Sequence, residues 1–425
     1  MKFLHTADLH LGAQFKSISL TDAETARRLR EATIIAYERI IQLAIDEEVD
    51  FVLFAGDVFN AEEDMQHAQL LFRRGIRRLD DAAIPSFVIC GNHDPLARGQ
   101  HRLALPESCT LFKADSVTAY PVVKDGNVVA QVIGISYATA RVTEKLVSRF
   151  PMGSSTITTV GMLHGNLANS VGHENYAPFT LADLEAKGYD YWALGHIHIH
   201  QEYPAGRAIA VYPGSPQGLD PTETGPHGCV IVAQDSQGVL HTKFHEICPV
   251  QWESKEITCS AGEAWKRRED LEQKLDDLLD TYLTKAEATE RSFALRINLT
   301  ARTPLYHSFS TLGARAGLLE EYRIRRSGDL FVWVEQFDWN LRPDIDIDEV
   351  LLQPSFEGEV ARASALAARE PAVLASYFTT DAAGLLWSNR TLDSLLADFK
   401  SPEVQTRLLE KARDLALDVL IVEEK

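Results

Sequence analysis

The feature that most constrains the fold is a set of five short apolar runs, each ending at a residue type that binds metals. The runs cover residues 1–7, 49–55, 84–90, 158–163 and 189–194, and each is followed within a few residues by Asp, Asn or His. Runs of this length and apolar character predict buried β-strands. Because open α/β sheets keep their sites beyond the carboxyl ends of the strands, the pattern predicts one polar site assembled from five strand ends.

Together the five strand ends deliver seven oxygen and nitrogen ligands: Asp8, His10, Asp57, Asn92, His164, His196 and His198. Side chains alternate between the two faces of a strand, so we expect the Asp-x-His and His-x-His pairs each to point to one side. One tetrahedral ion takes four ligands, so seven indicate two ions that share a bridging carboxylate. The alternative, a local loop role for each residue, accounts for any one position but not for five strand ends at once.

We expect Asp57 to be the bridge, because one carboxylate can give an oxygen to each ion. The first ion is then held by Asp8, His10, Asp57 and His198, and the second by Asp57, Asn92, His164 and His196. A mixed set of His, Asp and Asn suits manganese, iron, zinc or cobalt better than calcium. Two such ions can share a water molecule and lower its pKa for attack on a phosphoester.

In this order, the motifs Asp-x-His, Gly-Asp, Gly-Asn-His-Asp, His and Gly-His-x-His resemble the calcineurin-like metallophosphoesterase superfamily. The stretches 4–12, 55–59 and 191–198 more closely resemble its SbcD type, the nuclease subunit of double-strand-break repair complexes. The resemblance covers roughly residues 1–250. It implies an α/β fold built on a two-sheet β-sandwich flanked by helices, with a small α/β cap domain and C-terminal helices. It also implies manganese as the metal and hydrolysis of phosphodiester bonds in DNA.

His93 lies between the expected ligand Asn92 and Asp94. A histidine beside a two-metal site is suited to protonate a leaving alkoxide because its pKa lies near working pH, and the carboxylate of Asp94 would fix its tautomer. In the family that the sequence resembles, the matching histidine is the catalytic acid. The alternative is a purely structural role for His93 in support of the ligands.

The chain departs from the SbcD-type pattern at Asn60, where that family usually has a histidine thought to help hold the scissile phosphate. Asn can donate a hydrogen bond but cannot carry charge. Because the substitution leaves all seven expected ligands in place, we expect metal binding to persist. The efficiency of exonuclease cleavage is the property that Asn60 puts in question.

We expect three segments: a dimetal phosphodiesterase domain at 1–250, a cap domain at 251–345 and a helical segment at 346–425. Hydrophobic patterns beyond residue 250 predict helices at 263–283, 357–368 and 403–422, and strands at 293–299 and 330–334. The resemblance implies that the C-terminal helices dock on a coiled-coil ATPase similar to SbcC, and that the protein forms a homodimer. Packing of these helices on the chain's own core is the alternative.

The chain has 425 residues, a net charge of −19 and five cysteines without a Cys-x-x-Cys pair. Such cysteine usage is typical of a reducing cytoplasm and offers no structural zinc site. No apolar stretch approaches the ~18 residues of a membrane span, and no secretory signal is seen, so we expect a cytoplasmic protein without membrane contact. The acidity is unusual for a DNA-binding protein, since phosphate contacts supply most of the affinity.

The sequence therefore predicts a metal-dependent DNA exonuclease and endonuclease that acts in DNA repair. The ATPase partner is implied by the resemblance, and any ATP dependence must come from a partner because the chain has no Gly-x-x-x-x-Gly-Lys-[Ser/Thr] loop. One alternative is a phosphoesterase on another substrate, such as a nucleotide, a phosphoprotein or a lipid pyrophosphate. Another is a mainly non-catalytic subunit that binds DNA ends, prompted by Asn60 and the net acidity.

Overall fold

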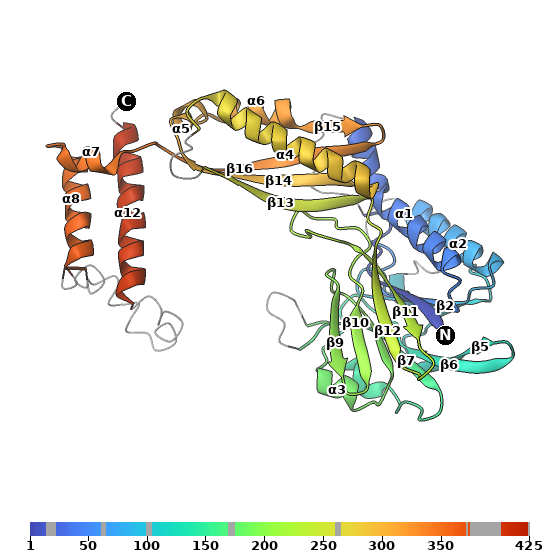
Figure 1. Ribbon diagram of the computed structural model, residues 1–425. Coiled ribbons are helices and arrows are strands. Elements are labelled where there is room, and N and C mark those ends of the chain that lie inside the picture. Colours follow the sequence, from blue (N-terminus) through green and yellow to red (C-terminus); the bar gives the residue numbers. More distant parts are fainter. Residues whose placement is uncertain are drawn as a thin grey trace. The chain divides into compact units, whose positions relative to one another are not determined.

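The computed structural model describes residues 1–13, 23–60, 65–98, 104–168, 175–259, 265–370, 373–374 and 401–423. They form an α/β structure with two six-stranded sheets, a four-stranded sheet and a group of C-terminal helices (Figure 1). The chain divides into two compact units: Met1–Lys255 with Asp277–Ile297 and Glu321–Phe337, and Glu256–Asp276 with Asn298–Glu320 and Asp338–Lys425. The expected two-sheet α/β fold is confirmed, whereas the domain boundaries near residues 250 and 345 remain a prediction.

The first sheet contains three of the five predicted strands. Its order is β12-β11-β1-β2-β3-β4, in which β1 to β4 run parallel and β11 runs antiparallel to both of its neighbours, β1 and β12. The strands are β1 (Lys2–Thr6), β2 (Phe51–Ala55), β3 (Ser86–Ile89), β4 (Cys109–Leu111), β11 (Gly228–Gln234) and β12 (Leu240–Glu246). Because the parallel strands end at the same edge, the residues after β1, β2 and β3 meet there.

The second sheet contains the other two predicted strands. Its order is β5-β6-β7-β8-β10-β9, in which β6, β7, β8 and β10 run parallel. The strands are β5 (Thr118–Lys124), β6 (Asn127–Gly134), β7 (Thr158–His164), β8 (Tyr191–Gly195), β9 (Gln201–Ala205) and β10 (Ala208–Tyr212). The strand ends that carry the expected ligands therefore come from both sheets.

Alternating side chains on the central strands fill separate cores. On β2, Leu53 belongs to the core between the sheets, whereas Phe54 packs with side chains of α1 (Ala23–Asp46) and α2 (Met65–Asp81). The other face of the second sheet packs with η2 (Leu146–Arg149) and α3 (Leu181–Glu185), and η1 (Leu96–Arg98) follows β3. Each fully buried side chain of this kind contributes about 1.5–3 kcal/mol, so the strand ends sit on a rigid frame.

The third sheet has the order β13-β14-β16-β15. Its elements and the neighbouring helices are β13 (Val250–Thr258), α4 (Arg268–Thr289), β14 (Ser292–Arg302), α5 (Leu305–Ser308), α6 (Leu312–Tyr322), β15 (Ile324–Ser327) and β16 (Leu330–Arg342). The strands predicted at 293–299 and 330–334 are confirmed and are longer than expected. The helix predicted at 263–283 is present as α4, and the first residues of that prediction lie outside the described part of the chain.

In the described part of the chain, the helices after β16 are α7 (Ile347–Leu352), α8 (Phe356–Arg369) and α12 (Pro402–Glu423). The side chain of Ser355 accepts a hydrogen bond from the Gly358 amide and so caps α8, as expected for a helix start. Both helices predicted in this segment are confirmed, and residues 375–400 of it lie outside the described range. Among the described helices, none has the length and apolar content needed to cross a membrane.

Candidate metal centre

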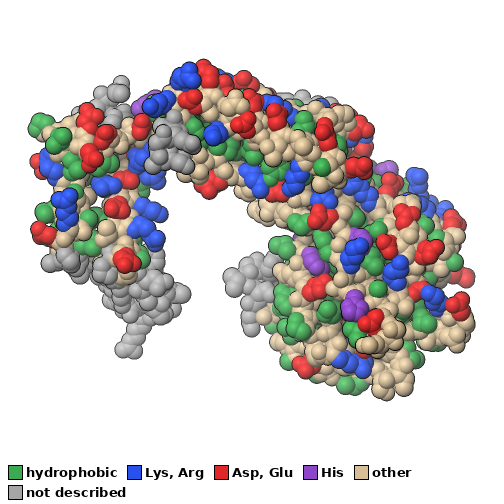
Figure 2. Space-filling view, in the orientation of Figure 1, with side chains coloured by type: hydrophobic (Ala, Val, Ile, Leu, Met, Phe, Trp, Pro, Cys, Tyr) green, Lys and Arg blue, Asp and Glu red, His purple; other side chains and the backbone are tan. Residues whose placement is uncertain are grey.

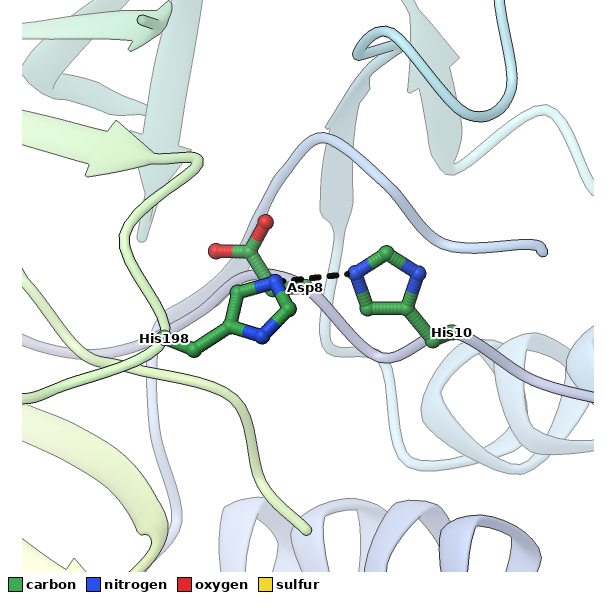
Figure 3. Close-up of side chains that lie close together, drawn as sticks. All are labelled: Asp8, His10 and His198. Carbon is green, nitrogen blue, oxygen red and sulfur yellow. Dashed lines mark hydrogen bonds between the residues drawn. The ribbon is translucent and has the colours of Figure 1, made fainter. Parts of the chain in front are cut away.

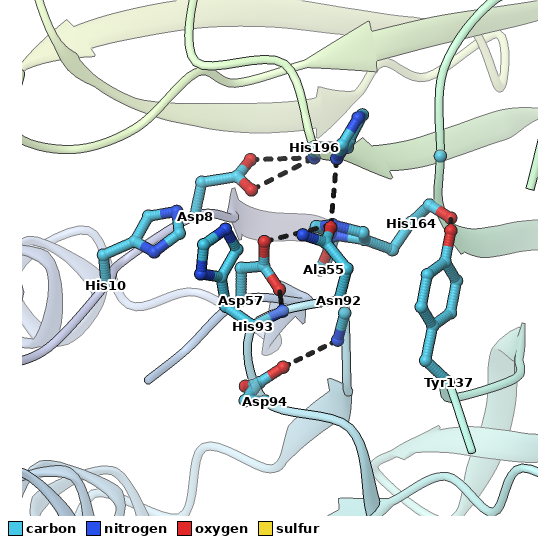
Figure 4. Close-up of polar contacts among 12 residues, drawn as sticks. Asp8, His10, Ala55, Asp57, Asn92, His93, Asp94, Tyr137, His164 and His196 are labelled. Carbon is cyan, nitrogen blue, oxygen red and sulfur yellow. Dashed lines mark hydrogen bonds and ion pairs between the residues drawn. The ribbon is translucent and has the colours of Figure 1, made fainter. Parts of the chain in front are cut away.

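All seven expected ligands lie at the joined carboxyl ends of the two sheets. His164 is the last residue of β7, and the other six lie in the loops that follow β1, β2, β3 and β8. Figure 4 shows six of them, all except His198, gathered across this edge. The backbone N–H of His196, which follows the second sheet, donates to both oxygens of Asp8, which follows the first, at 3.1 and 3.0 Å.

The first group consists of Asp8, His10 and His198, whose ligand atoms all lie within 4.8 Å of one another (Figure 3). The Nε2 atoms of His10 and His198 are 3.1 Å apart. Two nitrogens that each lie ~2.0–2.1 Å from one ion in tetrahedral geometry are separated by about 3 Å. The spacing therefore fits two imidazoles that share a cation.

The second group consists of Asp57, His164 and His196. The Oδ1 atom of Asn92 lies 3.1 Å from Nε2 of His164 and 3.1 Å from Nδ1 of His196, so the amide completes this group. These are the residues that the sequence assigned to the second ion.

Asp57 lies between the two groups. One of its oxygens is 3.3 Å from Nε2 of His164, and Asp57 also forms a close group with His10 and His93. A carboxylate in this position can offer one oxygen to each ion. The arrangement matches the predicted division of ligands, and binding of metal by these residues remains a prediction.

Four of the seven residues have a left-handed backbone. The φ angles are +52° at Asp8, +44° at His10, +49° at Asp57 and +101° at His196. Such conformations are rare for residues other than glycine and cost on the order of 1–3 kcal/mol each, and they cluster at functional sites. They also correct one expectation: the Asp-x-His and His-x-His pairs lie beyond the strands, so backbone turns rather than strand alternation direct them to the site.

Three motif glycines allow the strand ends to approach His164. A Cβ atom at Gly56 or Gly91 would collide with the His164 imidazole, and one at Gly195 would collide with the carbonyl oxygen of Ala55. That same carbonyl lies 2.9 Å from Nδ1 of His164, which leaves Nε2 facing the second group. The glycines of the Gly-Asp, Gly-Asn-His-Asp and Gly-His-x-His motifs are therefore required by close packing around one histidine.

Two fully buried carboxylates among histidines give the site unusual electrostatics. Burial raises the pKa of Asp8 to about 6, although His164 and His198 act against this. Burial also disfavours the charged form of Asp57, but His164 more than offsets it and holds the Asp57 pKa well below its usual range. Burial lowers the pKa of His164, yet Asp57 outweighs burial and brings it to about 9. The carboxylates thus attract positive charge, which a divalent cation would also supply.

His93 and Asp94 are placed differently from one another. His93 is exposed at the edge of the site, and its Nδ1 atom lies 3.2 Å from Oδ1 of Asn60. Asp94 is buried, and its oxygens accept hydrogen bonds from the amides of Gly91 and Val58 at 2.7 and 2.8 Å. Asn60 thus lies at the His93 ring, and Asp94 ties together the loops after β2 and β3. The orienting role expected of Asp94 toward His93 remains a prediction.

One functional contact was missed by sequence reasoning. Oε1 of Glu223 lies 2.7 Å from Nδ1 of His198. Glu223 belongs to a loop with several prolines and glycines, and no periodicity or motif distinguishes it from other acidic loop residues. Only the tertiary structure reveals the contact.

Comparison with known proteins agrees with this geometry. The family model described as calcineurin-like phosphoesterase matches residues 1–200. An uncharacterized metallophosphoesterase, YhaO of Bacillus subtilis (strain 168), is 31% identical over 362 residues, which cover 84% of this chain and 86% of the relative.

More distant relatives carry names from DNA repair. The DNA double-strand break repair protein Mre11 of Sulfurisphaera tokodaii is 28% identical over 223 residues, and the match covers 51% of this chain and 54% of that protein. The chain thus spans about half the length of this relative.

A solved structure of a dimetal phosphatase from Danio rerio is similar over 58% of this chain and 98% of its own, with a TM-score of 0.36 and 12% identity. On the family model and the YhaO match, the chain belongs to the calcineurin-like phosphoesterase family.

Proposed function

We propose that the protein is a metal-dependent DNA nuclease, with both exonuclease and endonuclease activity, that acts in DNA repair. The observation that carries the proposal is the pair of ligand groups on either side of Asp57, with the exposed His93 beside them. Membership of the phosphoesterase family supports hydrolysis of a phosphoester. The relatives named Mre11 support DNA as the substrate.

The donor set fits two divalent ions, and we propose Mn²⁺. Asp8, His10 and His198 would hold one ion, the second group with Asn92 would hold the other, and Asp57 would contact both. When bound, the ions supply Lewis acidity and a water of lowered pKa. A set of imidazoles, carboxylates and one amide oxygen is suited to manganese and its neighbours in the transition series.

The protein side chains then perform two tasks. The ligands form the centre on closely packed loops, because Gly56, Gly91 and Gly195 let the strand ends approach the buried His164. His93 is accessible, and it can hold a proton at Nε2 for the departing sugar oxygen while Nδ1 faces Asn60. Asn60 can thus orient the ring without adding charge.

The wider setting is also part of the proposal. The C-terminal helices expose large apolar side chains, among them Leu352 (85% exposed), Phe356 (67%) and Val419 (59%). Exposed apolar surface of this kind marks binding sites for other proteins, which supports docking on a coiled-coil ATPase similar to SbcC. We propose the cytoplasm as the compartment and a homodimer as the assembly, both on the sequence resemblance alone.

Two observations keep other functions in view. The chain carries a net charge of −19, and Figure 2 shows acidic and basic side chains mixed over the visible face rather than gathered into one basic surface. Asn60 also occupies the position beside His93 where a charged phosphate contact was expected. The charge distribution favours a phosphoesterase with a non-DNA substrate, and Asn60 favours a mainly non-catalytic subunit that binds DNA ends.

The test is cleavage of end-labelled duplex DNA and of bis-nitrophenyl phosphate by the purified protein with Mn²⁺. His93→Ala removes the proposed acid, and His241→Ala is the matched control, because His241 lies exposed on β12 in an ion pair with Asp235. We expect cleavage of both substrates, lost in His93→Ala and retained in His241→Ala. Cleavage of the small ester alone would contradict nuclease activity by this chain and leave a phosphoesterase on another substrate.

A further inference from the structure

We propose that Glu223 is a positioning residue for the first ligand group, holding the His198 ring in the orientation and tautomer that present Nε2 to a cation. This inference rests on the proposed two-metal function. It concerns a residue outside the metal-ligand motifs, 25 positions from the histidine that it contacts.

The two nitrogens of His198 have different partners. Nδ1 lies 2.7 Å from Oε1 of Glu223, and Nε2 lies 3.1 Å from Nε2 of His10. An ionised carboxylate only accepts hydrogen bonds, so Nδ1 carries the proton that is donated to Glu223. In the neutral imidazole, which is the form that binds metals, the lone pair is then on Nε2, the atom that faces the first ligand group (Figure 3).

Glu223 is itself held in place. Its second carboxylate oxygen accepts the Leu219 amide at 2.8 Å, and its backbone N–H donates to the carbonyl of Asp220 at 2.9 Å. Its backbone carbonyl lies 3.2 Å from Nε2 of the buried His227. The side chain is only 19% exposed. A carboxylate fixed at both oxygens and at its backbone can fix the ring that it contacts.

The second group uses a different partner for the same purpose. His164 has the carbonyl oxygen of Ala55, rather than a carboxylate, 2.9 Å from its Nδ1. A carboxylate partner raises the basicity of a metal-binding imidazole, and loss of such a partner typically weakens metal binding about 10- to 100-fold. We therefore expect substitution of Glu223 to weaken one of two metal-binding events and to leave the other unchanged.

The experiment is calorimetric titration of the full chain with Mn²⁺, for the wild type and for Glu223→Gln and Glu223→Ala. Asp235→Asn is the matched control. Asp235 lies 2.8 Å from Nε2 of His241, so this substitution removes a similar carboxylate–histidine pair that lies away from the site. Thermal unfolding without metal is measured for each variant, since a purely structural role would lower that stability and leave the metal affinities equal.

We expect two Mn²⁺-binding events in the wild type. In Glu223→Ala, one of the two affinities should fall about 10- to 100-fold, and in Glu223→Gln it should fall less. In Asp235→Asn, both affinities should stay unchanged. If Glu223→Ala does not fold, Glu223→Gln carries the test, because its amide oxygen can still accept from Nδ1 but carries no charge. Unchanged affinities in a folded Glu223 variant would overturn the proposal, as would a wild type that binds no Mn²⁺. Weakened binding by an enzyme that leaves DNA intact would support the role of Glu223 and contradict only the DNA substrate.

Discussion

The edge that carries the ligands and the group of C-terminal helices are built in contrasting ways. At the edge, Asp8 and His164 are fully buried, and a single added methyl group at Gly91 would collide with Asp57. Among the described residues of the C-terminal helices, Val350, Ala361 and Leu417 form a small buried apolar cluster, and large apolar side chains remain exposed.

Charge plays opposite roles in the two regions. In the C-terminal helices, Asp418 of α12 pairs with Arg302 and Arg342 at 3.0 and 3.3 Å, so charges join the elements of this unit. At the ligand edge, the buried carboxylates Asp8 and Asp57 draw positive charge toward themselves. This contrast is what we expect if, as proposed, cations complete the edge and a partner surface covers the helices.

The largest effect is expected from Asp57→Asn, which removes the charge shared by both ligand groups. Loss of both ions removes several kcal/mol of transition-state stabilisation, so cleavage of bis-nitrophenyl phosphate should fall by more than about 1000-fold. Metal content and cleavage rate are measured together, with Asp235→Asn as the control. If Asp57→Asn retains one ion and most of its activity, Asp57 is not shared by the two ligand groups. The proposed difference between the ligand edge and the C-terminal helices would then be wrong.

His93→Ala should have the next largest effect, because it removes a proton donor without touching a ligand. We expect the rate of DNA cleavage to fall about 10²- to 10⁴-fold while Mn²⁺ affinity stays within a factor of about three. Single-turnover kinetics and calorimetry on the same preparation check both numbers. A parallel fall in metal affinity would assign His93 to the ligand set instead.

The C-terminal helices should respond to loss of their small core and not to loss of exposed apolar groups. Leu417→Ala should destabilise α7, α8 and α12 by about 2–4 kcal/mol, since Leu417 is fully buried. Leu415→Ala, at a site 54% exposed, should change stability by less than about 0.5 kcal/mol. Hydrogen exchange of these helices measures both, and equal effects would show that Leu415 is also covered. Cleavage of the small ester should be unaffected.

Titration of histidine should change the stability of the two six-stranded sheets but not that of the C-terminal helices α7, α8 and α12, because the chain has no histidine after His307. Burial lowers the pKa of His5 on β1 to about 3. In the unfolded chain, His5 takes up a proton near pH 6.5, whereas in the folded chain it stays neutral down to about pH 3. The free energy of unfolding is therefore unaffected by His5 above pH 6.5 and decreases as pH falls below it. Between pH 7 and pH 4.5, His5→Gln should lose about 2–3 kcal/mol less stability than the wild type. Denaturant unfolding at both pH values measures this, and equal losses would contradict the assignment.

The smallest expected effect is a gain. Asn60→His restores a residue that can carry charge beside His93, where Asn60 now lies 3.2 Å from the ring. We expect a few-fold faster exonuclease cleavage, with no change for the small ester, because only a polynucleotide extends beyond the reacting phosphate. End-labelled DNA assays compare the two proteins. The absence of any gain would remove Asn60 as an argument for a non-catalytic role.

The same contrast explains what the sequence could predict. The strands could be predicted because each is an apolar run in the sequence. The expected ligands could be predicted because each follows such a run, so the local pattern contains the information. Three features could not be predicted, since each depends on a segment far away in sequence. They are the left-handed backbone at Asp8, the position of Asp94 and the contact of Glu223 with His198. For the C-terminal helices, the pattern predicted the helices but not what covers their apolar faces.

The central claim is that one carboxylate joins two metal-binding groups into a single centre. The most direct test is electron paramagnetic resonance of the full chain loaded with two equivalents of Mn²⁺. Because Asp57 belongs to the second group and also lies close to His10 of the first, we predict the spectrum of a spin-coupled manganese pair, which reverts to that of isolated ions or of free Mn²⁺ in Asp57→Asn. A wild-type spectrum of isolated Mn²⁺ at full loading would contradict the two-metal account.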